Sequence, residues 1–219
     1  TAQAGNVLIG EKSYTVDTTA LFKAGPGVQY MALEFRGPRR MNAFILKVDL
    51  TNPYVTYRAA ISNDSIYGGE QPPRVAARKS REGEVYIAGT NGDFYHTTGY
   101  VGLPTGFTMV NHEIADIPTD PVHRMVMAFD DAKTPYAGAM SYTGTLNIGS
   151  NSYSIAHVNH VREAGELVLY NQLNGKYTHT ENDGTEVLVK LTAGNTWGVN
   201  KPLEAEVEKI ETGKGNMLI

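Results

Sequence analysis

The stretch VYIAGTNGDFYHTTGYVGLPTGFTMVNHEI, residues 85–114, decides the fold that the sequence predicts. Its apolar start, residues 85–88, predicts a buried strand, and the glycine-rich run after it predicts a tight turn that includes Asp93. A second apolar run, residues 106–110, predicts the next strand. Polar side chains therefore gather where core strands meet a loop, and such places are common binding or catalytic sites.

Strand patterns are frequent on both sides of this stretch. Residues 28–36, 41–50 and 54–61 are joined by short connections, which predicts an antiparallel meander. Residues 177–180 and 185–191 flank an Asp-Gly pair, which favours a tight turn and predicts a hairpin. The remaining predicted strands are residues 125–129, 144–148, 152–158, 167–170 and 203–210.

One helix is predicted before the central strand, at about residues 72–82, because prolines suit a first helical turn and Gly83 ends the run of helix formers. Its basic residues form either a phosphate- or nucleic-acid-binding surface or a solvated face, and we favour the solvated face. The sum is an α+β, β-rich fold on an antiparallel sheet. Residues 1–24 are expected to form an N-terminal arm or edge hairpin, and residues 25–219 the main domain.

Composition excludes several classes of protein. The chain has 219 residues, of which 41% are hydrophobic, and this is enough for a sizeable core. A net charge of −4 gives no overall case for nucleic-acid binding. The absence of cysteine excludes a thiol nucleophile, a thiolate metal site and a disulfide. No apolar run reaches the roughly 20 residues of a membrane-spanning helix.

The 85–114 stretch also carries a family resemblance. An Asn-Gly-Asp-aromatic turn, a Pro-x-Gly strand start and an apolar strand with a Glu-Ile turn follow one another in order. The chain resembles the phosphodiester glycosidase domain in the residues Ala88, Gly89, Asn91, Gly92, Asp93, Phe94, Gly102, Leu103, Pro104, Thr105, Gly106, Glu113 and Ile114. Residues 124–133 and 158–170 resemble later strands of its bacterial members, so the resemblance covers residues 25–219 approximately.

The resemblance implies a hydrolase that cleaves a sugar-1-phosphodiester bond. It implies a carbohydrate or sugar-phosphate substrate, no cofactor, and an extracytoplasmic place: secreted, periplasmic or at the cell surface. It further implies a segment rich in Asp-Gly-Gly-Gly-Ser after Ile219, so we expect residues 25–219 to be an incomplete domain. The small polar residues 1–6 are typical of a mature or trimmed N-terminus.

Asp93 is the best candidate for a catalytic carboxylate, with Asn91 beside it. A glycosidase usually needs two carboxylates that flank the scissile bond. The alternative is that Asp93 and Asn91 only build the turn, since both residue types often do so. Gly92, His96 and Thr105 are expected to contact the substrate, and the imidazole of His96 suits proton transfer near neutral pH.

Arg124 is the first choice for holding the substrate phosphate, with His123 beside it. Because side chains alternate along a strand, only one of these two is expected to enter the site. Asn159 and Arg162 either line a sugar site or close a loop between strands, and we favour the loop. His157 and His160 are too few ligands for a metal site.

Two functions of different class follow. The first is a phosphodiester glycosidase with Asn91, Asp93 and Arg124 in its pocket. The second is a glycan-binding or structural module of an extracytoplasmic bacterial protein, in which the same turn and the tyrosines hold a carbohydrate without cleaving it. A second carboxylate near Asp93 would favour the enzyme.

Overall fold

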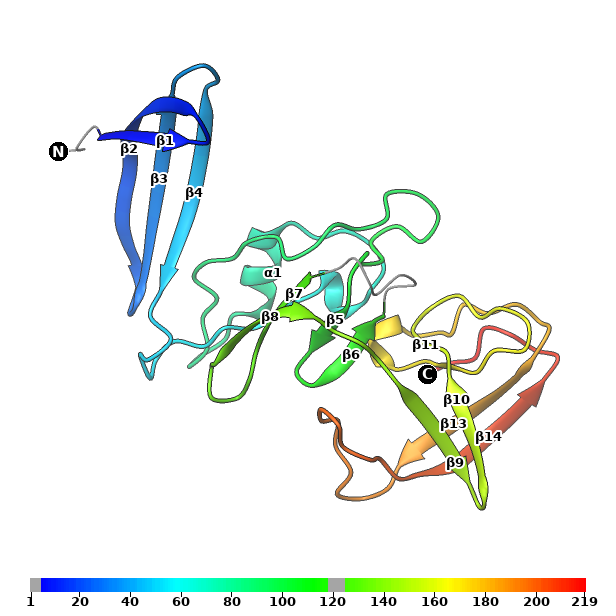
Figure 1. The fold of residues 1–219 in the computed structure, drawn as a ribbon. Helices are drawn as coiled ribbons and strands as arrows, with labels where there is room; N and C mark the ends of the chain where they lie inside the picture. Colours follow the sequence, from blue (N-terminus) through cyan, green and yellow to red (C-terminus); the bar gives the residue numbers. More distant parts are fainter. Residues whose placement is uncertain (1–4, 118–124) are drawn as a thin grey trace. The chain divides into compact units, whose positions relative to one another are not determined.

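The computed structural model describes residues 5–117 and 125–219 and divides the chain into two compact units. Strands dominate, and α1 (Pro72–Lys79) is the one α-helix in the described ranges (Figure 1). The predicted α+β, β-rich class with an antiparallel sheet is confirmed. No helix in the described part of the chain is long and apolar enough to cross a membrane. Unit 1 comprises Thr1–Tyr57, Lys79–Gly89 and Phe129–Thr134, and unit 2 comprises Arg58–Arg78, Thr90–Ala128 and Pro135–Ile219.

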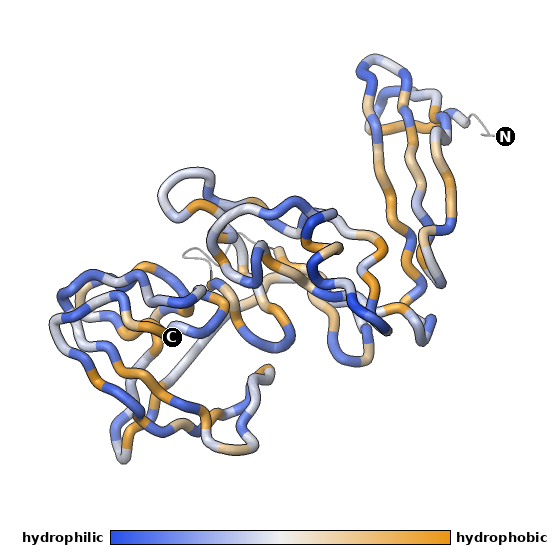
Figure 2. The backbone as a smooth tube through the Cα atoms, turned by 180° about the vertical axis from the view of Figure 1, so that it is seen from behind, coloured by the Kyte–Doolittle hydropathy of each residue, from blue (hydrophilic) through white to orange (hydrophobic). Residues whose placement is uncertain are grey.

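Unit 1 is built on a four-stranded antiparallel sheet whose strands follow chain order (Figure 1). Hydrophobic residues run along these strands (Figure 2). The strands predicted at 28–36 and 41–50 are confirmed. Of the two forms expected for the N-terminal segment, arm or edge hairpin, the structure has β1 paired with β2, while the domain boundary at residue 25 stays a prediction. The strands are β1 (Gly5–Ile9), β2 (Lys12–Gly25), β3 (Val28–Arg36) and β4 (Met41–Val48).

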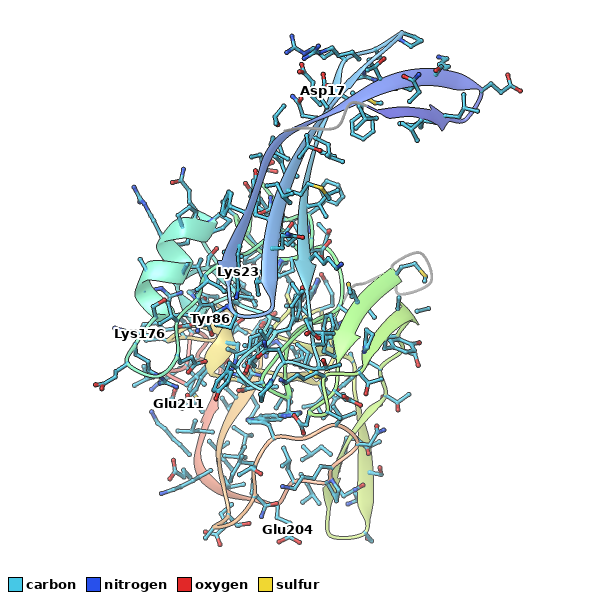
Figure 3. All side chains as sticks on the ribbon, turned by 90° about the vertical axis from the view of Figure 1, so that its left-hand side faces the viewer. Asp17, Lys23, Tyr86, Lys176, Glu204 and Glu211 are labelled. Carbon is cyan, nitrogen blue, oxygen red and sulfur yellow. The ribbon has the colours of Figure 1, made fainter. Side chains whose placement is uncertain are left out.

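A cluster of charges lies near one end of this sheet. Glu34 and Asp17 are direct cross-strand neighbours, an arrangement in which like charges repel. Arg36 donates to Glu34 Oε2 from Nε at 3.2 Å and from Nη2 at 2.9 Å, and its Nη2 lies 3.1 Å from Asp17 Oδ2. Hydrogen bonding to Arg36 holds the pKa of Glu34 below its ordinary value. Asp17 and Lys23 lie apart along β2, on either side of its middle (Figure 3).

The strand predicted at residues 85–88 is wrong. Arg81 and Glu84 bond to each other across a tight turn, with N···O distances of 2.8 and 3.0 Å. Tyr86 N then donates to Ser80 Oγ at 3.0 Å, so this amide is not available to a neighbouring strand. The run is exposed as well, since Val85 keeps 67% of its surface open to solvent.

The strand predicted at residues 54–61 is also wrong. Asn52 forms a turn in which its side-chain Oδ1 accepts from Tyr54 N at 2.9 Å and its carbonyl accepts from Val55 N at 3.1 Å. Two amides at the start of the run are therefore used locally, and the segment continues without regular structure.

The other strands form short pairs, most of them antiparallel. The strands predicted at 106–110, 125–129, 144–148, 152–158, 167–170 and 203–210 all overlap observed strands, whereas β6 and β8 were not predicted. The pairs are β5 (Thr108–Val110) with β6 (Glu113–Asp116), β7 (Met125–Phe129) with β8 (Pro135–Ala139), β9 (Gly144–Ile148) with β10 (Asn151–Ile155), β11 (His157–Val158) parallel to β12 (Val168–Leu169), and β13 (Thr185–Leu191) with β14 (Ala205–Thr212).

The helix α1 ends at Lys79, three residues before the predicted end at residue 82. Arg78, on this helix, donates to Glu70 from Nε at 3.0 Å and from Nη2 at 2.8 Å. It also contacts Asp64 Oδ2 at 2.5 Å, in the 3-10 helix η1 (Ser62–Asp64). The hydrogen bonds from Arg78 lower the pKa of Glu70 below its ordinary value. The Arg78 guanidinium therefore ties the helix to its own unit.

The hairpin predicted between residues 177–180 and 185–191 is wrong, because β13 pairs with β14 instead. Residues near 178 bond to the last residues of the chain. Thr178 N donates to Met217 O at 2.9 Å, Met217 N donates to Thr178 Oγ1 at 2.9 Å, and Ile219 N donates to Lys176 O at 3.0 Å. The chain does turn at Asn182-Asp183, but β13 after this turn pairs with β14 and not with residues 177–180.

Buried amides hold the interior of unit 2 together. Asn159 Nδ2 donates to Ala115 O at 3.0 Å and to Asn171 Oδ1 at 2.6 Å, and Asn171 N donates back to Asn159 Oδ1 at 2.9 Å. Asn171 Nδ2 reaches Ile114 O at 2.8 Å, and Asn171 Oδ1 accepts from Leu173 N at 3.1 Å. The amide network of Asn159 and Asn171 therefore links β6 to the ends of β11 and β12. It adjoins the small apolar cluster of Ile66, Leu103 and Ala115.

We expect Asn171→Ala to lower the free energy of unfolding of unit 2 by about 2–4 kcal/mol, because it takes an acceptor from the buried Asn159 Nδ2 and removes the bonds to Leu173 N and Ile114 O. Asn147→Ala on the exposed surface of β9 is the control and should change it by less than about 0.5 kcal/mol. Urea unfolding followed by circular dichroism measures both. Equal effects of the two substitutions would contradict a structural role for the network.

Candidate functional site

The loop that carries Asp93 folds back on itself as a small hairpin. Tyr95 and Pro104 bridge across it, and Thr105 N donates to Phe94 O at 3.1 Å. His96 N donates to Leu103 O at 2.9 Å, and Gly102 N donates to His96 O at 2.9 Å. These main-chain bonds order residues 94–105. We call this segment the Asp93 hairpin.

Asp93 lies at the open end of this hairpin, where three donors orient its carboxylate. Oδ1 accepts from Phe94 N at 2.7 Å and from Thr105 Oγ1 at 3.3 Å, and Oδ2 accepts from Gly106 N at 2.6 Å. A Cβ at position 106 would lie 2.7 Å from Asp93 Oδ2, so glycine allows this close approach. The carboxylate closes the hairpin and remains exposed to solvent.

A second carboxylate, Asp116, lies near Asp93. Asp116 ends β6 and is 2% exposed, and its Oδ1 is one of the few buried side-chain atoms in the described residues with no hydrogen-bond partner. The pKa of Asp116 is raised to about 7, mainly by burial and to a smaller extent by the charge of Asp93, against the lowering effect of the Ile117 amide. The charge of exposed Asp93 therefore acts on a carboxyl group that is buried.

Sequence reasoning missed Asp116. The signal is in the run IADI, residues 114–117, where one acid stands among apolar residues that are expected to be buried. A buried carboxyl without a hydrogen-bond partner is costly for the fold, and such groups gather at functional sites.

Aromatic residues of unit 2 line a hollow of about 50 Å³. Tyr67 contacts the ring of Tyr100 at a centroid distance of 5.8 Å and the ring of His179 edge-on at 5.2 Å. The pKa of Tyr67 is raised to about 12, mainly by burial and to a smaller extent by Tyr100 and Asp116, so the charge of the buried acid reaches this wall. We call this hollow the tyrosine pocket, with walls formed by Tyr67, Tyr100, Tyr170, His160, His179 and Arg162 among others.

The predicted site residues divide between the hairpin and the pocket. Asn91, Gly92 and His96 are exposed, and Thr105 contacts Asp93. The pKa of His160, in the pocket wall, is lowered mainly by burial, and the charge of His96 adds a small lowering.

Two further candidates lie beyond the hairpin. Arg162 lines the tyrosine pocket and pairs with Asp183, whereas Asn159 is fully buried in the amide network. The predicted phosphate ligands Arg124 and His123 lie outside the described residues.

The two neighbouring histidines His157 and His160 are not part of a metal centre formed by described residues. The rings of His157 and His160 lie 5.0 Å apart, and His157 Nε2 is 3.8 Å from Glu166 Oε1. Within residues 5–117 and 125–219, no group of three or more His, Asp or Glu side chains is placed to hold a metal ion.

Gly102 sets the position of the Asp93 hairpin. Its φ is +98°, and an added Cβ would overlap the main chain of Gly68, whose amide donates to Val101 O at 2.7 Å. Gly99 has a φ of +67° with open space around it, so it is a matched control for the backbone strain alone. We expect Gly99→Ala to cost about 1 kcal/mol of unfolding free energy, and Gly102→Ala to cost at least about 2 kcal/mol more. Denaturant unfolding measures the free energies of unfolding of both variants. Equal losses in the two would contradict the close approach of Gly102 to the main chain of Gly68.

Asp116 should make the stability of the fold depend on pH. Its pKa is raised in the folded state, so its favourable contribution is complete below about pH 4 and is lost as pH rises through about 7. Asp116→Asn removes this loss, and the free energy of unfolding of the variant relative to the wild type should rise by about 4 kcal/mol from pH 3 to pH 8. Urea titrations at several pH values measure it. If the difference in free energy of unfolding between the variant and the wild type does not change with pH, Asp116 is not a buried neutral acid in the folded protein.

Comparison with known proteins adds no family to this geometry. The chain matches no family model, no curated protein and no solved structure. The resemblance to the phosphodiester glycosidase domain therefore stays a prediction that depends on residues 85–114.

Proposed function

We propose that unit 2 belongs to a glycoside hydrolase that cleaves a sugar-1-phosphodiester bond. The supporting observation is the pair of neighbouring carboxylates in unlike environments, exposed Asp93 and buried Asp116. Glycosidases use one carboxyl group to donate a proton and a second carboxylate to act on the anomeric carbon or on water. Two acids whose environments push their pKa values apart are the usual way to obtain both roles at one pH.

The roles follow from the environments. Asp93, oriented by its three donors, takes the proton from water while the water oxygen bonds to the anomeric carbon. The bond between that carbon and the phosphate oxygen breaks, and the electron pair leaves with the phosphate monoester. Asp116, uncharged up to about pH 7, supplies the proton to the leaving side. Arg124 and His123 remain the predicted ligands of the phosphate.

A glycan-binding module without catalysis is the second candidate. The tyrosine pocket favours it, because aromatic walls with a few polar groups suit a sugar. In that case the Asp93 carboxylate only closes its hairpin.

Hydrolysis of a panel of sugar-1-phosphate methyl esters by the full-length protein tests the proposal. We expect release of free sugar, a loss of about 10²–10⁴-fold in kcat/KM for Asp93→Asn and for Asp116→Asn, and a fall in wild-type kcat/KM above about pH 7 as Asp116 loses its proton. Glu206→Gln, which removes an exposed carboxylate on β14, is the control and should keep the wild-type rate. Full activity of Asp93→Asn, or no hydrolysis of any ester by the wild type, would rule the proposal out.

A further inference from the structure

Strand β4 forms one edge of the four-stranded sheet of unit 1 (Figure 1). Among the strands of the described residues it pairs with β3 alone. Alternate residues of an edge strand direct their main-chain N–H and C=O groups outward, where a further strand can bond to them. β4 therefore presents a row of main-chain donors and acceptors that the strand pairing within the described residues does not use.

The sequence of β4 does not protect this edge. Proteins usually protect an edge strand by shortness, charge, proline or a bulge. β4 has eight residues, no proline and one charged residue, Lys47, and its pairing with β3 has no register shift. Phe44 is 71% exposed and Ile45 is 37% exposed. The opposite edge strand, β1, has five residues, so β4 offers the longer row of main-chain groups.

A second copy of β4 fits this edge when the two strands run antiparallel. Such strands bond through residues that direct their main-chain groups toward each other, and in a regular strand these are alternate residues. A two-fold pair of β4 strands is therefore centred on one residue, with facing residues equally far from that centre. Centred on Ala43, the pair places Lys47 opposite Arg39, which are like charges. Centred on Ile45, it places Lys47 opposite Ala43, and no two charged residues face each other.

Charge favours the register centred on Phe44. This register places Arg39, two residues before β4, opposite Asp49, which directly follows β4. The pair of opposite charges occurs twice, once at each end of the two-fold arrangement. The Asp49 carboxylate accepts from Thr51 Oγ1 at 2.7 Å and from Thr51 N at 3.0 Å, and these bonds hold the pKa of Asp49 below its ordinary value. Asp49 is therefore charged at neutral pH.

The same register brings the two Phe44 rings together. Facing side chains of an antiparallel pair lie on the same side of the sheet, with Cβ atoms about 5 Å apart. Aromatic pairs at such positions stabilise sheets. We propose that the β4 strands of two copies of this chain pair antiparallel about Phe44 and join two four-stranded sheets into one continuous sheet. The inference uses residues of unit 1 alone and does not rest on the proposed function.

Sedimentation equilibrium of the whole chain, over about 1–200 µM protein, tests the dimer. We expect twice the mass of the single chain at the highest concentration. Phe44→Lys places two ammonium groups opposite each other, so it should raise the Kd of the dimer at least about tenfold. Leu8→Lys is the matched control, because Leu8 is 70% exposed on the other edge strand, and it should leave the Kd unchanged.

A charge exchange tests the register. Arg39→Asp alone places two acids opposite each other, and Asp49→Lys alone places two bases opposite each other, so each variant alone should raise the Kd at least about tenfold. In a mixture of the two variants, opposite charges face each other again at both ends, and the Kd should return to within about threefold of the wild type. This return separates the loss of the charge pair from the loss of the Thr51 bonds in Asp49→Lys.

The inference is overturned if the wild type stays monomeric at every concentration, as it does when another part of the same chain covers β4. It is equally overturned if Phe44→Lys dimerises like the wild type, if Leu8→Lys weakens the dimer as much as Phe44→Lys, or if the mixture of the two charge variants stays monomeric.

Discussion

The buried hydrogen bonds of Asn159 and Asn171 are the constraint on which unit 2 depends. The unit has little regular structure and many exposed apolar side chains, so packing alone fixes few of its segments. Two side-chain amides satisfy main-chain groups at Ala115, Ile114 and Leu173 and thereby join segments far apart in sequence. Because buried polar groups are costly when they lose a partner, this network favours one arrangement of those segments over others.

That arrangement places an acid at the end of β6, one residue after Ala115. Asp116 weakens the fold at neutral pH, since burial opposes its ionisation. Natural proteins keep such groups where function requires them, and a trade between stability and activity is the usual outcome. The loss of stability caused by buried Asp116 and the solvent exposure of Asp93 are both expected if the site needs a proton donor beside a charged carboxylate.

Sequence patterns predicted the strands well where the strand has a long antiparallel partner, as in β3 and β14. They failed at residues 54–61 and 85–88, where a side chain or a turn takes amides that a strand would need. The turn at Asn182-Asp183 is present, but the strand partner predicted from it is wrong, because a local turn signal does not depend on a strand far away in the sequence. Turn propensity is local, whereas pairing is decided by the whole chain.

The candidate site shows the same division. The sequence placed Asp93, Thr105 and His96 together because one loop carries them. It did not reveal that Asp116 lies near Asp93, or that Arg162 joins Tyr67 and Tyr100 in one pocket, because these meetings depend on tertiary contacts. The separate segments of the lining share no sequence pattern that would predict that they meet.

The bonds between Thr178 and Met217 have a consequence for biosynthesis. Thr178 is part of the pocket wall, yet its main-chain partner is made almost forty codons later. When the pocket tyrosines have been translated, the segment around Met217 that bonds to this wall has therefore not yet been made. The nascent chain stays without a finished pocket until residue 217 emerges from the exit tunnel.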